Sequence, residues 1–287
     1  MPNIREIKVR IQSVQNIGKI TQAMKVVASA RMKKAQERIL GARPYAFRLA
    51  DVIHDLSLSV DRSLHPLFAK NPEGKKALLV VTADRGLCGS FNANVLRRTQ
   101  AYLRENPTAT LMTVGRKSRD FLKRRGFALR NDWIGVFPAV TEDSVNAITK
   151  EIVTLFTQEN FTSVEVIYNE FKNLVQQKLT VEQVLPLDPA VLKGDRTTDY
   201  AGGEFLFEPG VDEILEVILP KYLSTEVRRI LLESFSSEMA ARRMAMESAS
   251  KNAREMIARL TLEYNRARQA AITKEIAEIV GGAAALQ

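Results

Sequence analysis

The sequence predicts a mixed α/β protein: two long terminal helices form an antiparallel coiled coil, and a Rossmann-like α/β domain lies between them in the chain. Residues 221–280 contain no proline and no glycine, the two strongest interrupters of a helix. A second long stretch, starting at Ile4, repeats apolar residues at gaps of three and four. Between these stretches, short apolar runs alternate with helical segments, which is typical of a largely parallel sheet.

The C-terminal stretch is predicted to be a helix that packs lengthwise against another helix. An unbroken helix over these residues would reach roughly 90 Å at about 1.5 Å per residue, so it must extend beyond a compact domain and needs a partner along most of its length. Four methionines on it fit adaptable packing in a seam: Met239, Met244, Met246 and Met256. One row of residues has the spacing of such a seam: Ala249, Ala253, Met256, Leu260, Tyr264, Ala267 and Ala271.

The N-terminal stretch predicts a first helix of roughly fifty residues, which continues to about Leu56 with a kink expected at Pro44. Two long amphipathic helices at opposite ends of one chain pair most simply as an antiparallel coiled coil. The apolar row of this helix begins Ile4, Ile7, Ile11, Val14, Ile17, Ile20, Met24 and Val27.

The middle of the chain changes character after the Pro- and Gly-containing residues 65–74. We therefore expect a discontinuous coiled-coil shaft of residues 1–60 and 209–287, a linker of residues 61–74 and an α/β domain of residues 75–208. Thr141 is the expected N-cap of one domain helix. The predicted domain elements are strands at 77–82, 109–114, 163–168 and 174–185, and helices at 93–104, 116–125 and 141–158.

Composition sets limits on the class of protein. An apolar content of 45 % supports a packed core, and the sequence contains no apolar run long enough to cross a membrane. The single cysteine, Cys88, rules out an intrachain disulfide. The N-terminus has no apolar signal core, and we interpret its basic, amphipathic start as part of the mature helix rather than a transit peptide.

The net charge of +9 is unevenly distributed. Residues 1–50 carry +9 and residues 116–130 carry +6, whereas residues 131–220 carry −11. Such a pattern is compatible with a solvated charged face, with binding to an acidic protein surface, or with binding to nucleic acid. We expect no nucleic acid, because the aromatic content is only 7 % and an apolar seam interrupts the basic face.

The sequence shows no convincing catalytic constellation. The glycine-containing loop at residues 84–90 lacks the spacing of a phosphate-binding or dinucleotide-binding loop, so a tight turn that feeds a helix is the better interpretation. Cys88 has only His54 and His65 as histidine partners, and both precede the α/β domain. We therefore expect no catalytic, cofactor-binding or metal-binding residues, although an unrecognised active site in the α/β domain stays open as an alternative.

Several stretches together resemble one family, the gamma subunits of F-type ATP synthases. They occur in the family's order and spacing along essentially the whole chain. The matching stretches are IGKITQAMKVVA at 17–28, DRGLCG at 84–89, EMAARRMAMESA at 238–249, NRARQAAITKEI at 265–276 and EIVGGAAAL at 278–286.

The resemblance implies the function of a rotary central stalk. In this family the coiled coil stands inside a hexamer of alpha and beta subunits, and the α/β domain sits with the epsilon subunit on the membrane-embedded c-ring. The chain transmits torque between ring and hexamer, so that proton flow is coupled to ATP synthesis or hydrolysis. The resemblance implies no catalytic site and no cofactor in this chain, and membrane association through the c-ring rather than through a transmembrane segment of its own.

The resemblance also implies contact residues. They fall into three groups: contacts to beta subunits, a smooth helix tip in the hexamer sleeve, and a foot near the c-ring and epsilon. The beta contacts are Lys19, Met24, Lys25, Arg31, Arg268 and Gln269; the tip is Ala283, Ala284, Ala285 and Leu286; the foot is Phe205, Phe207 and Glu208.

Two departures from other members are informative: the first argues against thiol regulation, and the second favours a bacterial protein, which would lie at the cytoplasmic face of the plasma membrane. The chain lacks the cysteine-pair insertion of light-regulated chloroplast members, and it shows no cleavable presequence.

Two other classes of protein stay open as alternatives. If the chain is a basic coiled-coil protein that binds nucleic acid, its binding of DNA or RNA is expected to depend strongly on salt. An α/β enzyme with helical arms predicts ligand binding by the isolated middle domain.

Overall fold

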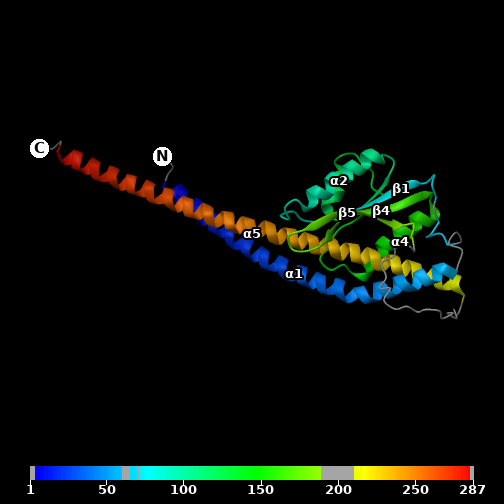
Figure 1. The fold of residues 1–287 in the computed structure, drawn as a ribbon. Helices are drawn as coiled ribbons and strands as arrows, with labels where there is room; N and C mark the ends of the chain where they lie inside the picture. The colour runs from blue at the N-terminus through cyan, green and yellow to red at the C-terminus, as the bar shows by residue number, and fades with distance from the viewer. Residues whose placement is uncertain (1–3, 60–64, 70, 189–209, 285–287) are drawn as a thin grey trace. The chain divides into compact units, whose positions relative to one another are not determined.

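The computed structural model describes residues 4–59, 65–69, 71–188 and 210–284. It contains two long helices, α1 over Ile4–Ser59 and α5 over Val211–Ala284 (Figure 1). Both predicted terminal helices are therefore confirmed. Pro44 lies inside α1 and Pro220 inside α5, so α5 begins well before the proline-free stretch from which it was predicted.

The chain divides into two compact units, and both long helices contribute to each unit. We call residues 1–28 with 242–287 the coiled-coil unit, and residues 29–241 the sheet unit. The expected division into a shaft of residues 1–60 and 209–287, a linker and an α/β domain has different bounds from these two units, and it stays a prediction.

In the coiled-coil unit α1 and α5 are antiparallel. A Cβ atom added to Gly18 would lie 3.6 Å from Cβ of Ala253, and the hydroxyl oxygens of Thr21 and Ser250 are 2.7 Å apart. One turn further along α1, Nζ of Lys25 donates to Oε1 of Glu247 at 3.0 Å. The residue numbers rise along α1 as they fall along α5, which fixes the direction of pairing.

The seam of this coiled coil follows a strict seven-residue repeat. From Lys251 to Gly281 of α5, every described residue outside the repeat is exposed. Such a repeat keeps one stripe of each helix facing its partner. The seam positions are Ile4, Ile7, Ile11, Val14, Gly18, Thr21, Lys25 and Ala28 on α1, and Met246, Ser250, Ala253, Ile257, Leu260, Tyr264, Ala267 and Ala271 on α5.

The predicted seam is wrong at six positions. At two of them the repeat passes through Lys25 and Ser250 rather than through the half-buried neighbours Met24 and Ala249. Ile17, Ile20 and Val27 of α1 and Met256 of α5 are about half exposed, while Gly18, Thr21, Ala28 and Ile257 take the seam positions. The physical reason is the close approach of the helices: small residues let the two backbones come together, and the neighbouring large side chains are then directed outward. Of the four methionines, Met239 and Met246 are buried, whereas Met244 and Met256 are exposed.

The sheet unit contains one five-stranded sheet of order β3-β2-β1-β4-β5. β1 pairs in parallel with β2 and β4, β2 pairs in parallel with β3, and β4 and β5 form an antiparallel hairpin. The largely parallel sheet is thus confirmed. The strands are β1 Lys75–Val81, β2 Thr110–Val114, β3 Asn131–Trp133, β4 Phe161–Phe171 and β5 Gln177–Leu185; the remaining helices are α2 Phe91–Glu105, α3 Arg116–Lys123 and α4 Glu142–Gln158.

Helices cover both faces of this sheet. On one face Leu78 and Val80 of β1 join a core with α2 and α3. On the other face Leu79 and Val81 join a larger core with α4 and with the sheet-unit parts of α1 and α5. Because successive strand residues point to opposite faces, the continuous apolar run of β1 supplies both cores.

The loops at the carboxyl ends of β1, β2 and β3 are tied together by Asp84. Its carboxylate accepts from the backbone N–H of Arg116 at 2.9 Å and of Gly135 at 3.1 Å. The hydroxyl of Thr82 accepts a hydrogen bond from the backbone N–H of Ser118 at 2.8 Å. Gly115 has a positive φ of 96°, and its Cα lies so close to the backbone of Thr82 that no Cβ atom would fit between them. These bonds hold the loop at residues 84–90 as a tight turn that leads into α2.

Candidate functional site

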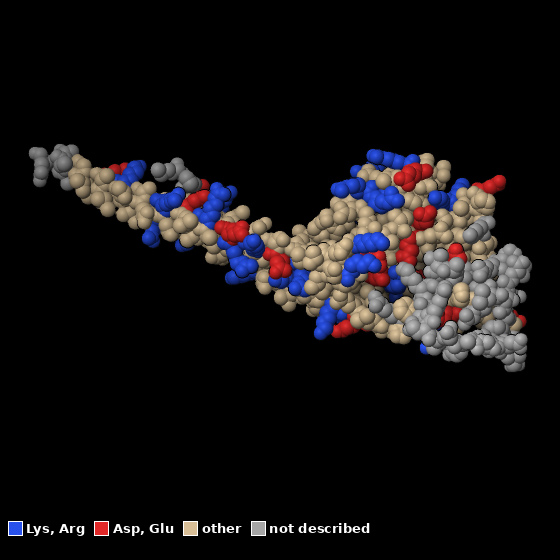
Figure 2. Space-filling view, in the orientation of Figure 1, with Lys and Arg blue, Asp and Glu red and all other residues tan. Residues whose placement is uncertain are grey.

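The candidate functional site is the outer surface of the coiled-coil unit. Since small residues occupy much of the seam, large apolar side chains are left on the outside of both helices. Figure 2 shows basic and acidic side chains scattered among other residues along the two paired helices. The exposed apolar side chains are Val9, Ile17, Ile20, Val26 and Val27 on α1, and Met244, Met256 and Leu262 on α5.

The end of α5 extends beyond its pairing with α1. The pairs Gly18–Ala253 and Thr21–Ser250 place residue 4 of α1 opposite about residue 267, so that residues after 271 have no counterpart in α1. All residues from 272 to 281 are exposed. Four of them are large and apolar and recur at gaps of four, three and one, which places them on one face of the helix: Ile272, Ile276, Ile279 and Val280.

An isolated helix end with an apolar stripe is unfavourable in water. Each large aliphatic side chain gains about 1.5–3 kcal/mol when it moves from water into an apolar environment. A continuous apolar stripe on an otherwise exposed helix marks a surface that another molecule covers. The end of α5 is therefore a candidate protein-binding surface.

The ion pairs described in the coiled-coil unit are mainly exposed pairs within one helix. Arg259 lies 3.2 Å from Glu263, and Lys274 lies 3.4 Å from Glu278. Lys25 is different because its partner, Glu247, lies on the other helix. The hydrogen bond from Lys25 lowers the pKa of Glu247.

The predicted beta-contact residues do not form a single cluster. Lys19, Arg268 and Gln269 are exposed, whereas Met24 and Lys25 are half-buried. Residues 19 and 268 are far apart along the coiled coil, because residue 19 pairs near residue 253 and about 15 residues of helix rise roughly 22 Å.

Arg31 belongs to the sheet unit, where it lines a 300 Å³ cavity. Sequence reasoning missed the two basic neighbours that share this cavity, Lys34 and Arg38. Arg38 donates to the carbonyl oxygen of Ala139 at 2.7 Å. Their recurrence at gaps of three and four is the sequence signal that could have found them.

The side chains of the other predicted site residues are not described by the structure. Ala283 and Ala284 lie in the last turn of α5, and their side chains are not described. Ala285 and Leu286, and the foot residues Phe205, Phe207 and Glu208, lie outside the described residues.

The loop at residues 84–90 uses its polar groups internally. The amide side chain of Asn92 accepts from the N–H of Ala83 at 3.0 Å and donates to Sγ of Cys88 at 3.2 Å. Cys88 itself is buried. Within the described ranges, no group of three His, Cys, Asp or Glu side chains is placed to hold a metal ion, and no described helix is long and apolar enough to cross a membrane.

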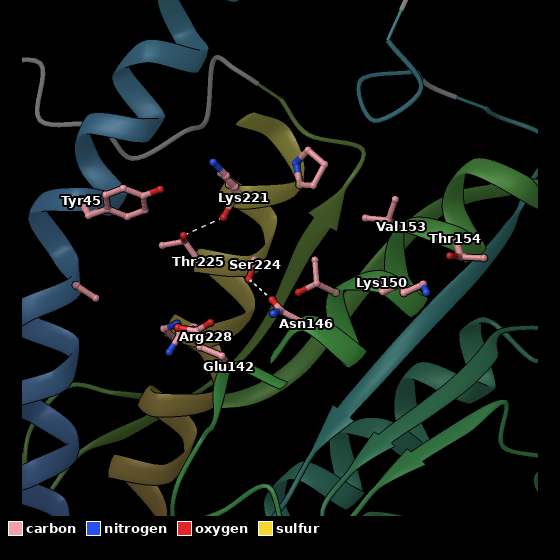
Figure 3. Close-up of a pocket in the computed structure, with 13 residues that line it drawn as sticks. Tyr45, Glu142, Asn146, Lys150, Val153, Thr154, Lys221, Ser224, Thr225 and Arg228 are labelled. Carbon is pink, nitrogen blue, oxygen red and sulfur yellow. Dashed lines mark hydrogen bonds and ion pairs between the residues drawn. The ribbon is translucent and has the colours of Figure 1, made fainter. Parts of the chain in front are cut away.

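A larger cavity of 680 Å³ lies between α1, α4 and α5 in the sheet unit (Figure 3). It is lined by cations from two helices, Lys150 of α4 and Lys221 and Arg228 of α5. Arg228 is paired with Glu142 of α4, and the hydroxyl of Ser224 donates to Oδ1 of Asn146 at 3.4 Å. These contacts tie α5 to α4 across the cavity.

Comparison with known proteins gives one consistent result. A family model described as ATP synthase matches residues 3–286. The chain is 42 % identical over 291 residues to the ATP synthase gamma chain of Geotalea daltonii and 43 % identical over 288 residues to that of Pelotomaculum thermopropionicum. Both matches cover 100 % of this chain and 100 % of the relative.

Solved structures show the same architecture. The chain is similar to a chain from the central stalk and c-ring of the Tetrahymena thermophila mitochondrial ATP synthase, with a TM-score of 0.62 and 26 % identity over 80 % of this chain and 99 % of that one. A chain from the Euglena gracilis mitochondrial ATP synthase has the same fold, with a TM-score of 0.68 and 22 % identity over 99 % of this chain and 94 % of that one.

The paired terminal helices, their exposed apolar end and these matches define a subunit of the membrane-bound ATP synthase complex. Within that class the assignment is specific. The chain belongs to the ATP synthase gamma chain family, whose members are the central stalk of the rotary enzyme. Family membership favours this class over the two alternatives that the sequence had left open, a coiled-coil protein that binds nucleic acid and an α/β enzyme with helical arms.

Proposed function

We propose that the coiled-coil shaft, residues 1–60 and 209–287, turns inside a hexamer of alpha and beta subunits, while the α/β domain of residues 75–208 serves as the foot on the c-ring, next to epsilon. The observation that carries this proposal is the end of α5, where the apolar stripe from Ile272 to Val280 has no counterpart in α1. An apolar sleeve around this end removes the stripe from water without directional bonds that would hold it at one angle.

The charged surface has a separate role. Lys19, Lys25 and Arg31 face acidic segments of the beta subunits, with Met24 beside them. Exposed charge pairs contribute only about 0–1 kcal/mol each, so they break and re-form at each step of a rotation. Arg268 and Gln269 hold a beta-subunit loop through charge-assisted and amide hydrogen bonds, which depend more strongly on orientation.

The helix tip and the foot make the remaining contacts. Ala283, Ala284, Ala285 and Leu286 form the tip in the sleeve, and the segment with Phe205, Phe207 and Glu208 contacts the c-ring and epsilon. The shaft comprises residues 1–60 and 209–287, and the foot comprises residues 75–208. Catalysis belongs to the partner subunits, so this chain carries no active site of its own, and the complex lies at the cytoplasmic face of a bacterial membrane.

Co-expression with separately tagged alpha and beta subunits tests the assembly. We expect a complex with one copy of this chain and ATPase activity that requires all three proteins. Recovery of this chain alone, bound to nucleic acid, would contradict the proposal.

The loop-holding role is tested with Arg268→Ala in that complex. Arg266→Ala is the matched control, because Arg266 is also exposed but lies two residues earlier, about 200° around the helix. We expect ATP turnover to fall about tenfold in Arg268→Ala, the effect of losing one charge-assisted hydrogen bond, and to change little in Arg266→Ala. Equal turnover in the two variants would exclude the role of Arg268.

A further inference from the structure

Two consecutive arginines of α5, Arg228 and Arg229, connect this helix to two different parts of the sheet unit. Arg228 is paired with Glu142 at the start of α4 (Figure 3). Nη2 of Arg229 donates to Oε1 of Glu182 on β5 at 2.7 Å, and its Nη1 donates to the hydroxyl of Tyr168 on β4 at 3.2 Å. Successive residues on a helix are about 100° apart, so the two side chains hold α5 from two directions.

The Arg229 contacts form a closed network rather than a single surface pair. Tyr168 donates in turn to Oε2 of Glu182 at 2.5 Å. On α5 itself, Arg229 donates to Oε2 of Glu226 from Nε at 2.9 Å and from Nη2 at 2.7 Å, and Glu233 lies 3.3 Å away. The guanidinium is thus bonded on each of its three nitrogens.

Burial makes this network strong. The side chain of Arg229 is 19 % exposed, and those of Glu182 and Glu226 are 25 % and 19 % exposed. Burial by itself would lower the pKa of Arg229, but Glu226, Tyr168 and Glu182 raise it, so the guanidinium stays charged. Charge-assisted bonds in a partly desolvated site are shorter, stronger and more directional than exposed ones.

The rest of the interface between α5 and the sheet is apolar. Leu219, Leu223, Val227, Ile230 and Leu231 of α5 are buried in the large core of the sheet unit. Rotation of α5 about its axis would move these side chains out of the core, so the core opposes it, but apolar burial is non-directional and sets the angle of the helix less sharply than hydrogen bonds do. The hydrogen bonds of the two arginines add a directional resistance to that of the core.

We propose that Arg228 and Arg229 form a rotational lock that keeps α5 from turning about its axis relative to the sheet, with Arg229 as the main positioning residue. A torque applied to the foot then passes into the long helix without a lag between the two. The proposal rests on the rotary role of the chain. It adds which side chains make the foot and the shaft turn as one body.

The test measures torsional stiffness in the complex of this chain with its alpha and beta subunits. The hexamer is fixed to a surface, and a bead is attached either to the sheet side through Arg104→Cys at the end of α2 or to the helix through Lys221→Cys on α5. Both positions are exposed, and the native Cys88 is buried, so that labelling selects the introduced thiol. The angular variance of the bead during catalytic pauses reports the stiffness up to its point of attachment.

In Arg229→Met we expect the variance to rise about twofold for the bead on α2, because the charge-assisted contacts from α5 to β4 and β5 are lost. We expect no change for the bead on α5. Arg130→Met is the matched control: Arg130 bonds Glu151 at 2.7 Å and Glu159 at 2.6 Å in the same unit, and these partners belong to α4 and its C-cap rather than to α5. This control leaves both variances unchanged.

A second pair of variants decides the matter if Arg229→Met fails to assemble. Glu182→Gln removes a carboxylate on β5 and raises the variance for the bead on α2. Glu226→Gln removes a carboxylate that lies on α5 itself, and it leaves that variance unchanged. Equal variances for Glu182→Gln and the unmutated chain, or an equal rise for both bead positions, would overturn the lock. Absence of rotation in the unmutated complex would instead refute the rotary role.

Discussion

The hydroxyl groups of Thr21 and Ser250 lie 2.7 Å apart in the buried seam of the coiled coil, 229 residues apart in the chain. The Thr21 hydroxyl also donates a hydrogen bond to the carbonyl oxygen of Gly18 at 3.0 Å. Because its one proton is used there, Oγ1 of Thr21 accepts the hydrogen bond from the Ser250 hydroxyl. A buried polar pair of this kind is satisfied in one register only, because a shift of either helix leaves both hydroxyls among apolar groups.

Thr21→Val is expected to weaken the local pairing by about 1–2 kcal/mol, because the hydroxyl of Ser250 loses its partner. The double variant Thr21→Val with Ser250→Ala is expected to cost less than the sum of the two single changes, since neither side then retains a buried polar group. Hydrogen exchange of the α1 amides around residue 21 measures both effects. Strict additivity would show that the two hydroxyls do not interact.

Gly18 is expected to show opposite effects for small and large replacements. In Gly18→Ala the new Cβ meets Cβ of Ala253 at an ordinary contact distance of 3.6 Å, and alanine favours a helix over glycine by about 1 kcal/mol, so the variant gains stability. Gly18→Leu forces the helices apart and costs about 1–3 kcal/mol. The same hydrogen-exchange measurement applies, and a stabilising Gly18→Leu would refute the close approach.

Gly115→Ala is expected to destabilise the sheet unit by about 2–4 kcal/mol. The residue has φ of 96°, and an added Cβ would lie 2.1 Å from the carbonyl oxygen of Thr82. Gly126→Ala is the control, since Gly126 also has positive φ, at 79°, but nothing lies within 4 Å of the added atom. Its cost is expected to be about 1–2 kcal/mol from the backbone alone. Urea unfolding of both variants checks the difference, and equal costs would contradict the crowding at Thr82.

Glu233 and Glu247 are expected to give stability changes of opposite sign with pH. Burial raises the pKa of Glu233 against the opposing effect of Arg229, while Glu170 and Glu182 add to the rise. Its contribution to stability is therefore present at low pH and is lost as pH rises through the raised pKa. The pKa of Glu247 is lowered by the hydrogen bond from Lys25, so its contribution is present at neutral pH and is lost as pH falls.

The measurement is the thermal unfolding midpoint of each glutamine variant relative to the unmutated chain, at pH 4 and pH 8. Glu233→Gln is expected to be relatively more stable at pH 8 than at pH 4, because the variant avoids the buried charge. Glu247→Gln is expected to be relatively less stable at pH 8. The same sign for both variants would contradict the assigned environments.

The sequence was sufficient to predict the long helices and most of the sheet. Helical periodicity predicted α1, periodicity together with the absence of Pro and Gly predicted α5, and short apolar runs predicted β1, β2, β4 and β5. Thr141 was confirmed as the N-cap of α4, where its side chain accepts from the N–H of Ser144. The strand β3 was missed because Asn-Asp-Trp has only three residues and no apolar run.

The phase of the coiled coil was harder to predict than its existence. Gaps of three and four fit both the row with Ile17 and Ile20 and the row with Gly18 and Thr21. Choosing the more hydrophobic row as the seam gives the wrong result, because Ile17 and Ile20 are exposed in the structure. The distance between the two helices decides between these rows, and that distance depends on the side chains of both helices together. For the same reason the lock around Arg229 could not be predicted, because Tyr168, Glu182 and Arg229 come together only in the folded sheet unit.

The seven-residue repeat of the seam also gives the coiled-coil unit a handedness. An α-helix has 3.6 residues per turn, so a strict repeat of seven keeps the two helices in contact only if they wind around each other in a left-handed supercoil. A twist of one sense adds turns to this supercoil and tightens the seam at Gly18 and Ala253. A twist of the other sense removes turns and opens it. The two directions of rotation therefore load the same pair of helices unequally.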